Sequence, residues 1–555
     1  MSVAARIPTW LRALVFYGLA AILTIGWHAI FHPKTVCACS GGGDPALFMW
    51  ALSWWPHALA HGLNPFVTYY EWSSTGVNIA QTTAIPTAAI VLFPFTELFG
   101  PVFSYNMLSI ASPALAAFTA YLLCRRIVGR ELPAIAGGYL FGFSSYEFSE
   151  LLGHLNLTLI FLIPVMVHLS LRRVDREISR RTYLLCMALV LILQVGLSTE
   201  ILADSVLFGA VTLLAARILA PQPQRARING LVLETVGAGL LAAVVLSPFF
   251  YYAIFKGVPK GNPGLSDVYA LDFANLFSPT DVTWLGHISF APLWSVFEGG
   301  DGSETAGYFG IAILLAFFLW CCNPRGRRAL RALLLIVVVV TLLLAFGSHL
   351  HVGGQSTIDL PYIWVRETPI FDAVIPSRFA LFTALAISIG LAAWLAQTQG
   401  HRIARWLLVL AGAVLIFPNL APPLFGAPIE NPKFFSTTLY RQYLKRNETV
   451  LMLPFGHNDV STLWQAESGF YFYMPEGYVS GEIPPPFEAE PGVIEMFQNT
   501  PPSPAVFEAF LRAHKVSHIV VDPHAAGPWP SLLASMGFHD QQVGGVLLYA
   551  VPSAP

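Results

Sequence analysis

Long apolar stretches separated by short, arginine-rich segments occupy most of the first 420 residues of this 555-residue chain. An α-helix needs about 20 apolar residues to cross the roughly 30 Å hydrocarbon core of a bilayer. Only 11% of the residues are charged, whereas an average soluble domain carries about 25%. So few charges cannot keep this many apolar stretches in water. The sequence therefore predicts an α-helical polytopic membrane protein.

The distribution of basic residues predicts eleven spans and their orientation. Lys and Arg concentrate in cytoplasmic loops, and nearly all arginines before the tail fall on one side if residues 84–99 are not counted as a span. We expect 84–99 to lie on, or dip into, the outer leaflet of the cytoplasmic membrane. The N-terminus is then cytoplasmic and the C-terminus lies outside. The expected spans are Leu11–Phe31, Val102–Cys124, Leu132–Phe148, Leu157–Leu171, Tyr183–Ser198, Ala203–Leu219, Leu231–Tyr252, Tyr308–Cys322, Ala329–Phe346, Phe379–Leu395 and Trp406–Leu420.

Four large segments are expected outside the membrane. They are residues 32–100, 255–307, 347–378 and the tail, residues 421–555. In this topology most of the 32 acidic residues lie in the outer half of the membrane or outside it, although carboxylates contribute little to topology. The outer face is therefore predicted to be the working face of the molecule.

The tail is predicted to form a small extracytoplasmic α/β domain after a membrane module of residues 1–420. Short apolar runs predict strands at 449–454, 516–522 and 546–551, and an amphipathic pattern predicts a helix at 505–514. Residues 477–504 are rich in Pro and Glu and are expected to form an extended loop.

The first outer loop opens with Gly41-Gly42-Gly43-Asp44-Pro45. Asp is a preferred helix N-cap and Pro a preferred first helical residue, so a helix is expected to start here. One oxygen of Asp44 would cap the helix while the other faces a cleft. Trp50 and Trp54 follow, and two alternatives remain open for them: an interfacial aromatic belt or a surface on which a sugar stacks.

The second span ends in the sequence Tyr121-Leu122-Leu123-Cys124-Arg125-Arg126-Ile127-Val128-Gly129-Arg130. This ending resembles the "YLL-x-RR-x-x-G" close of the second span in bacterial relatives of the protein O-mannosyltransferases. The layout of residues 1–220 is also similar to that of the GT-C glycosyltransferases. It has one long helix, a first outer loop that opens with an acid, and an apolar helix outside the bilayer.

The resemblance implies transfer of a sugar from a polyprenyl-phosphate carrier to a cell-envelope glycan, lipid or protein. In the family an acid of the first outer loop acts as general base or holds a divalent metal ion, Mg²⁺ or Mn²⁺. Only Asp44 occupies that position here, and Pro45 and Ala46 follow where many relatives carry a second acid. The metal ligands are therefore not assigned from the sequence.

Three basic residues are candidate ligands for a lipid phosphate. A departing phosphate needs cations or hydrogen-bond donors, and Arg378, Lys256 and Lys260 are expected at the outer mouths of spans. The alternative is that these long side chains reach up to lipid headgroups.

Two groups of ionisable residues are predicted at membrane depth. Glu150 and His154 are four residues apart, so a helix would place them on one face. Glu200 interrupts an apolar hairpin together with Asp204. Ionisable residues are costly inside a bilayer. These groups are therefore expected either in solvated turns or along a cleft that binds acceptor, metal or phosphate.

Other classes of function are disfavoured by the sequence. The net charge of −2 excludes a generally basic nucleic-acid binder, and the chain carries neither a zinc-ligand spacing nor a phosphate-binding glycine loop. Cys37 and Cys39 would lie in an oxidising compartment, and their pairing is left open.

We therefore expect an inverting, polyprenyl-phosphate-dependent glycosyltransferase with Asp44 as its base. One alternative is a flippase or transporter of lipid-linked saccharides. Transporters often show paired halves and broken helices, which the sequence does not display. The other alternative is a membrane scaffold whose tail binds cell-envelope polymers, which would leave acids such as Glu200 without a purpose.

Overall fold

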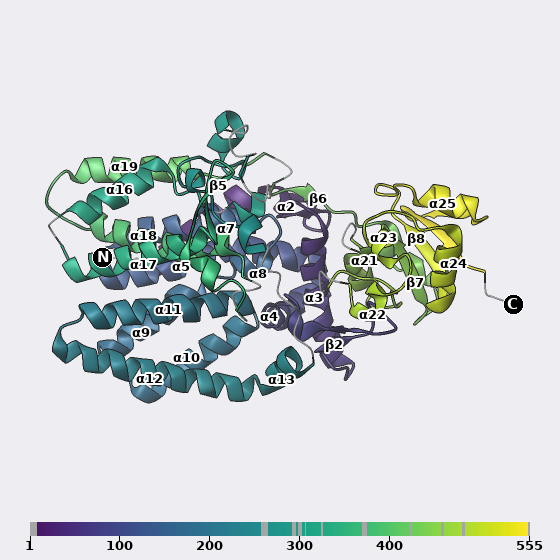
Figure 1. Ribbon diagram of the computed structural model, residues 1–555, viewed down its shortest axis with the longest axis horizontal. Coiled ribbons are helices and arrows are strands. Elements are labelled where there is room, and N and C mark those ends of the chain that lie inside the picture. Colours follow the sequence, from purple (N-terminus) through teal and green to yellow (C-terminus); the bar gives the residue numbers. More distant parts are fainter. Residues whose placement is uncertain are drawn as a thin grey trace, which may run out of the picture. The chain divides into compact units, whose positions relative to one another are not determined.

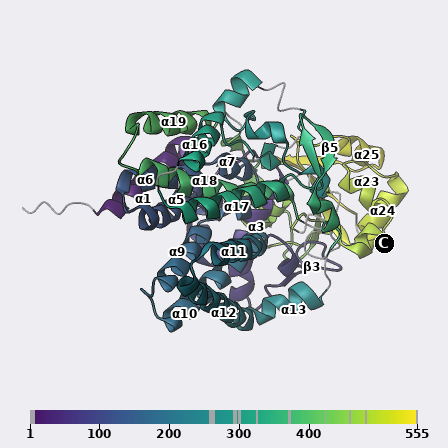
Figure 2. The ribbon, with the colours of Figure 1, turned by 60° about the vertical axis from the view of Figure 1, so that its left-hand side comes forward.

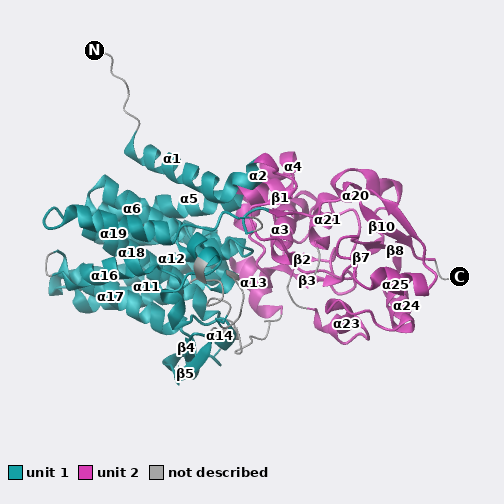
Figure 3. Ribbon diagram, turned by 90° about the horizontal axis from the view of Figure 1, so that it is seen from above, with its two compact units in different colours: residues 1–30, 108–245, 260–426 teal, residues 31–107, 246–259, 427–555 magenta. Residues whose placement is uncertain are grey.

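The computed structural model (Figures 1 and 2) describes residues 8–256, 265–290, 296–297, 302–305, 307–323, 326–368, 374–421, 424–456, 460–479 and 483–552. The chain forms two compact units, each assembled from separate stretches (Figure 3). Unit 1 consists of Met1–Ile30, Leu108–Val245 and Lys260–Gly426, and unit 2 consists of Phe31–Met107, Leu246–Pro259 and Ala427–Pro555.

Unit 1 is a bundle of helices. In both Figure 1 and Figure 2, α9 to α12 form one group and α16 to α19 another. Helix α18 is buried along nearly its whole length and packs against α6, α16, α17 and α19. An apolar helix that is covered on all sides forms the core of such a bundle. The main helices are α1 (Thr9–Ala21), α5 (Pro101–Val128), α6 (Glu131–Gly142), α9 (Leu162–Val174), α10 (Arg180–Val195), α11 (Thr199–Leu219), α12 (Gln222–Val245), α16 (Ile311–Cys322), α17 (Arg328–Ala345), α18 (Ala380–Leu395) and α19 (Arg402–Leu415).

Seven helical segments in the described part of the chain are long and apolar enough to cross a membrane. They are Thr9–Phe31, Pro101–Val128, Leu155–Val174, Thr199–Leu219, Gln222–Val245, Arg328–Ala345 and Pro376–Leu395. Each overlaps an expected span. At the other four expected places the structure has the shorter helices α6, α10, α16 and α19, of 12, 16, 12 and 14 residues. The count of eleven spans remains a prediction.

Unit 2 contains residues 32–100, the segment that was expected to form the first outer loop and is called so below. Helix α3 (Gly43–Ala60) packs against α4 (Pro86–Phe99), so a helix does form at the expected 84–99 stretch. The small sheets pair β1 (Val36–Cys37) with β6 (Ala427–Pro428) and β2 (Val67–Thr68) with β3 (Val77–Asn78). A disulfide joins Cys37 and Cys39. Helix α13 (Ser247–Phe255) completes this part of the unit.

The tail contributes a four-stranded sheet with strand order β7-β8-β10-β9. Strand β7 (Thr449–Leu453) is parallel to β8 (Val516–Val521), and β10 (Val546–Ala550) runs antiparallel to both β8 and β9 (Asp540–Val543). The three expected strands and the expected helix, α24 (Pro504–Ala513), are present. Strand β9 was not predicted because its sequence, Asp-Gln-Gln-Val, is polar and exposed. Helix α21 (Ser461–Glu467) and the aromatic residues around Trp464 pack into the core of this sheet.

Backbone and side-chain hydrogen bonds join the first outer loop to the tail within unit 2. Met474 N donates to the carbonyl of Tyr70 at 2.8 Å, and Ser73 N donates to the carbonyl of Met474 at 3.0 Å. Gln465 in α21 donates to the carbonyl of Tyr70 and accepts from Trp50 Nε1, both at 2.8 Å. The contacts therefore group residues 31–107 with the tail, whereas the sequence led us to expect a division near residue 420.

Candidate functional site

Arg378 is the centre of a charged cluster in unit 1. It lies in the 3₁₀ turn Pro376–Phe379 that leads into α18. Its Nη1 atom donates to both carboxylate oxygens of Glu200 at 2.8 Å. Its Nε and Nη2 atoms donate to Oε2 and Oε1 of Glu304, and Ser377 Oγ donates to Oε2 of Glu304 at 3.1 Å. One guanidinium group is thus held between two carboxylates from separate segments.

His154 extends the cluster toward Glu150. Glu150 ends α7 (Ser145–Glu150), and His154 lies four residues further on, directly before α8 (Leu155–Thr158). Their expected proximity is confirmed: His154 Nδ1 lies 2.9 Å from Glu150 Oε2 and 3.6 Å from Glu304 Oε1. Glu200 belongs to the first turn of α11, where Ser198 Oγ accepts from the backbone of Ile201. A negative side chain is favoured at this end of a helix.

The cluster holds more negative charge than its single arginine can neutralise. Glu147 and Asp204 interact electrostatically with Glu150 and Glu200 respectively. Five carboxylates therefore belong to the cluster: Glu150, Glu200, Asp204 and Glu304 interact with Arg378, and Glu147 interacts with Glu150. Buried charges are costly unless they are paired or coordinate a metal ion. Protons or a further cation must therefore balance part of this charge.

The two buried acids beside His154 differ in their pKa. Burial, followed by the neighbouring carboxylate of Glu304, raises the pKa of Glu150 to about 7. Burial also favours the neutral form of Glu304, but Arg378 above all, and then His154 and Ser377, outweigh it and lower the pKa of Glu304 below its ordinary value. Glu304 is therefore the ionised partner of the arginine.

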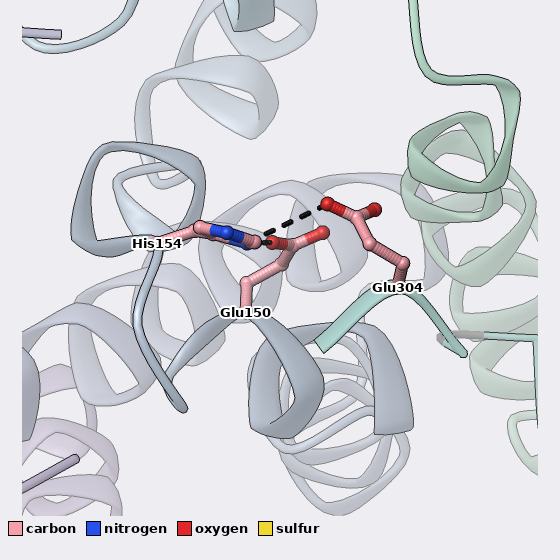
Figure 4. Close-up of side chains that lie close together, drawn as sticks. All are labelled: Glu150, His154 and Glu304. Carbon is pink, nitrogen blue, oxygen red and sulfur yellow. Dashed lines mark hydrogen bonds and ion pairs between the residues drawn. The ribbon is translucent and has the colours of Figure 1, made fainter. Parts of the chain in front are cut away.

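Glu150, His154 and Glu304 are spaced like ligands of a metal ion (Figure 4). Each offers one ligand atom, and the three atoms lie within 4.8 Å of one another. Glu150 is completely buried, and its Oε1 atom has no hydrogen-bond partner in the described structure. Two carboxylates and one imidazole fit Mn²⁺ better than Mg²⁺, which favours an all-oxygen shell. The residues present therefore fit a Mn²⁺ ion, but at a different place from the first outer loop, where the resemblance puts the acid that holds a metal.

Asp44 lies in unit 2, in the first turn of α3. The helix N-cap is Gly42 at φ 97°, and no side chain forms a capping hydrogen bond. The expected capping role of Asp44 is therefore wrong, because the glycines preceding the helix adopt a left-handed backbone that lets it start two residues earlier. Asp44 Oδ1 instead accepts a hydrogen bond from the hydroxyl of Tyr478 at 2.8 Å.

Trp50 and Trp54 are core residues of unit 2. Their exposed fractions are 0% and 1%, and their rings stack with centroids 5.2 Å apart. Phe470 packs edge-on against both rings, and Trp54 Nε1 donates to the carbonyl of Pro65. In this structure neither ring offers a face to a sugar or to lipid headgroups.

The two candidate lysines differ in what the structure shows. Lys256 directly follows α13, is exposed, and places its ammonium group 5.5 Å from the centre of the Tyr251 ring. Lys260 lies outside the described residues.

Sequence reasoning missed Glu304, Tyr478 and Glu71. Glu304 ends a short turn, Gly302–Glu304, in a polar loop, and no spacing rule connects it with Glu150 or Arg378. Tyr478 lies in the stretch that was expected to be an extended loop. Glu71, next to an aromatic run, is completely buried, which its sequence position did not indicate.

The apolar helices of spanning length define the chain as a polytopic helical membrane protein. The chain belongs to the family described as "Domain of unknown function (DUF6311)", whose sequence profile matches residues 14–422. A comparison with curated proteins finds no match.

Several solved structures are similar to this chain over nearly its whole length. ArnT from Cupriavidus metallidurans bound to undecaprenyl phosphate is 13% identical, with 98% of each chain covered and a TM-score of 0.48. AglB, an oligosaccharyltransferase from Archaeoglobus fulgidus in complex with an inhibitory peptide and a dolichol-phosphate, is 13% identical, with 98% of this chain and 74% of that chain covered and a TM-score of 0.46. The apo form of the Archaeoglobus fulgidus oligosaccharyltransferase is 12% identical, with coverage of 99% and 75% and a TM-score of 0.42.

Proposed function

We propose that this membrane protein is a glycosyltransferase that moves a sugar from a polyprenyl-phosphate carrier to an acceptor outside the cytoplasm. The observation that carries the proposal is the placement of Asp44. It is the acid that opens the first outer loop, and its carboxylate is held by the hydroxyl of Tyr478. The segment Tyr121–Arg130, which resembles the close of the second span in relatives of the protein O-mannosyltransferases, supports the same class.

The proposed reaction is a single displacement with inversion. The acceptor hydroxyl oxygen attacks the anomeric carbon, the bond from that carbon to the phosphate oxygen breaks, and the carrier phosphate leaves with its electron pair. Asp44 takes the proton of the attacking hydroxyl. A positioned carboxylate that acts in this way is a general base.

Release of the carrier is the direct test of this function. The full chain in liposomes is supplied with undecaprenyl-phosphate-linked hexoses and pentoses and with cell-envelope extract as the source of acceptor. We expect free undecaprenyl phosphate and a new glycosidic bond with at least one donor. A chain that moves the lipid-linked sugar across the bilayer without forming such a bond would instead be a flippase, and the proposed function would be wrong.

We propose that Arg378 binds the carrier phosphate by exchanging one of its carboxylate partners. The side chain of Glu200 is 26% exposed, whereas that of Glu304 is 5% exposed. Glu200 is therefore the partner that a phosphate can replace at the smaller cost. Arginine suits this role because its planar guanidinium group binds phosphate and carboxylate in the same two-point geometry.

Replacing Glu200 with glutamine is expected to strengthen binding of undecaprenyl phosphate by roughly tenfold, because a competing charged hydrogen bond is lost. The dissociation constant of undecaprenyl phosphate, measured on the purified full chain, checks this. The matched control is Asp267→Asn, which removes the acid of another ion pair, 2.6 Å from Arg366. Equal affinity in Glu200→Gln and wild type would contradict the exchange.

Glu150, His154 and Glu304 are the residues that would hold a divalent metal ion in this protein. When bound, such an ion supplies positive charge next to Arg378 and thereby favours a bound phosphate. The protein side of the site consists of a buried carboxylate oxygen without a partner and an imidazole already directed at both acids.

Glu150→Gln is expected to weaken Mn²⁺ binding by roughly tenfold or more, since ligand charge is a main determinant of affinity at such sites. Electron paramagnetic resonance titration with Mn²⁺ alone measures this without reference to activity. The matched control is His349→Ala, which removes an imidazole that pairs with Asp359 at 2.9 Å on the exposed β4–β5 hairpin (His349–Val352 and Gln355–Asp359). Unchanged Mn²⁺ affinity in Glu150→Gln would exclude this ligand set.

A further inference from the structure

The tail reaches back to the first outer loop beside Asp44. Trp72 N donates to the carbonyl of Glu476 at 3.2 Å, and the pairing of Tyr70 and Ser73 with Met474 lies directly before it. These bonds bring Gly477, Tyr478 and Val479, which we call the strap, against the first loop. The strap therefore belongs to the tail in sequence and to the first loop in its contacts.

Glu71 fixes the backbone of the strap. Its Oε2 atom accepts from Tyr478 N at 3.1 Å and from Val479 N at 3.2 Å, and Glu71 is completely buried. One carboxylate oxygen thus accepts from two consecutive backbone donors, and removing it would leave both donors unsatisfied. Gly477 allows this approach, because a Cβ atom there would lie 2.2 Å from Glu71 Oε2.

The side chain of Tyr478 connects the strap to Asp44. Its hydroxyl group donates to Asp44 Oδ1 at 2.8 Å. Burial, and then the charge of Asp44, raise the pKa of the Tyr478 hydroxyl, so the group remains a donor throughout the physiological range. Asp44 thus receives a hydrogen bond from a side chain whose own backbone is clamped by Glu71.

We propose that Tyr478 is a positioning residue for Asp44, and that Glu71 positions Tyr478 by holding the strap. The inference rests on the proposed role of Asp44 as general base. It extends that role to the tail, because Tyr478 lies beyond residues 14–422, which match the family profile. A displacement needs its base in one orientation relative to the attacking hydroxyl group. A misplacement of about 1 Å can lower the rate by about 100-fold.

The first test measures the contact without any substrate. Asp44→Ala, Tyr478→Phe and the double variant are compared by thermal unfolding of the full chain. Substitutions of residues in contact are not additive, so we expect the shift of the double variant to be smaller than the sum of the single shifts. Additive shifts would overturn the inference, whatever the activity of the protein.

The second test measures the clamp by hydrogen–deuterium exchange. In Glu71→Ala the amides of Tyr478 and Val479 lose their acceptor, and we expect them to exchange faster than in wild type. The control is Glu97→Ala, which removes an exposed acid of the same unit from α4. Unchanged exchange at both amides in Glu71→Ala would show that Glu71 does not hold the strap and would overturn this part of the inference.

The third test separates positioning from folding. Tyr478→Phe is expected to lower kcat for carrier release by up to about 100-fold with KM unchanged, and to have no further effect on kcat in an Asp44→Asn background. Tyr473→Phe is the control, since Tyr473 belongs to the same tail and stacks on Tyr70 with ring centroids 4.9 Å apart. Wild-type kcat in Tyr478→Phe would overturn the inference while the proposed function stands. If the thermal shifts of the first test were non-additive but the wild-type chain released no carrier, the contact between Asp44 and Tyr478 would stand and the proposed function would be wrong.

Discussion

Replacing Asp44 with asparagine is expected to lower carrier release by about 10²- to 10⁴-fold, the usual contribution of a general base. Asparagine has nearly the same shape and still offers an oxygen to the hydroxyl of Tyr478, 2.8 Å from Oδ1 in the wild type. Folding should therefore persist while proton transfer is lost. The measurement is kcat for release of undecaprenyl phosphate, with the thermal unfolding temperature recorded on the same sample.

The control for this variant is Glu97→Gln, which neutralises an exposed acid elsewhere in unit 2. We expect it to retain wild-type release. If Asp44→Asn also retained full release, the assignment of Asp44 as base would be wrong, even though the chain could still be a glycosyltransferase with another base. If Asp44→Asn failed to fold, its binding of undecaprenyl phosphate would be lost as well, and this second measurement separates the two cases.

The start of α3 shows how far local sequence rules reach. Gly-Gly-Gly-Asp-Pro correctly predicts that a helix begins here, because glycine and proline have strong backbone preferences. The same rules assign the N-cap to Asp44. In the structure the N-cap is Gly42, whose positive φ is a conformation that glycine adopts readily. The actual partner of Asp44 is 434 residues away in sequence, beyond the reach of any spacing rule.

The fold also explains why α3 is so apolar. A helix that is apolar on all faces, as α3 is, needs cover on all sides. Trp50 and Trp54 are covered by α21 and Phe470 of the tail, which is why the first loop and the tail form one unit. From sequence alone, the same residues are explained by a membrane interface, with a surface on which a sugar stacks as the alternative.

In the charged cluster, the part that is local in sequence was predictable and the rest was not. Glu150 and His154 are one helical turn apart, and their side chains do meet. Glu304 joins them from a loop, 74 residues before Arg378 in the chain. Its contribution depends on how separate helices pack, and a single polar turn in the sequence does not determine that packing.

Replacing Arg378 with methionine is expected to destabilise the protein by about 3–5 kcal/mol, the usual effect of removing one partner from a buried ion pair. The variant leaves Glu304, whose side chain is 5% exposed, without the guanidinium group that neutralises it. Glu200 loses both of its 2.8 Å hydrogen bonds at the same time. The measurement is the free energy of unfolding of the full chain in detergent micelles.

Two further variants decide whether uncompensated charge is the cause. Adding Glu304→Gln to Arg378→Met is expected to recover part of the lost stability, because the buried carboxylate that has lost its partner becomes neutral. Arg366→Met breaks a more exposed pair, with side chains 24% and 33% exposed, and should cost about 1 kcal/mol or less. If Arg378→Met were no more destabilising than Arg366→Met, Arg378 would not be the counterion of Glu304. The five carboxylates would then have to be balanced by protons or by the metal ion alone, and added Mn²⁺ should raise the stability of Arg378→Met more than that of wild type.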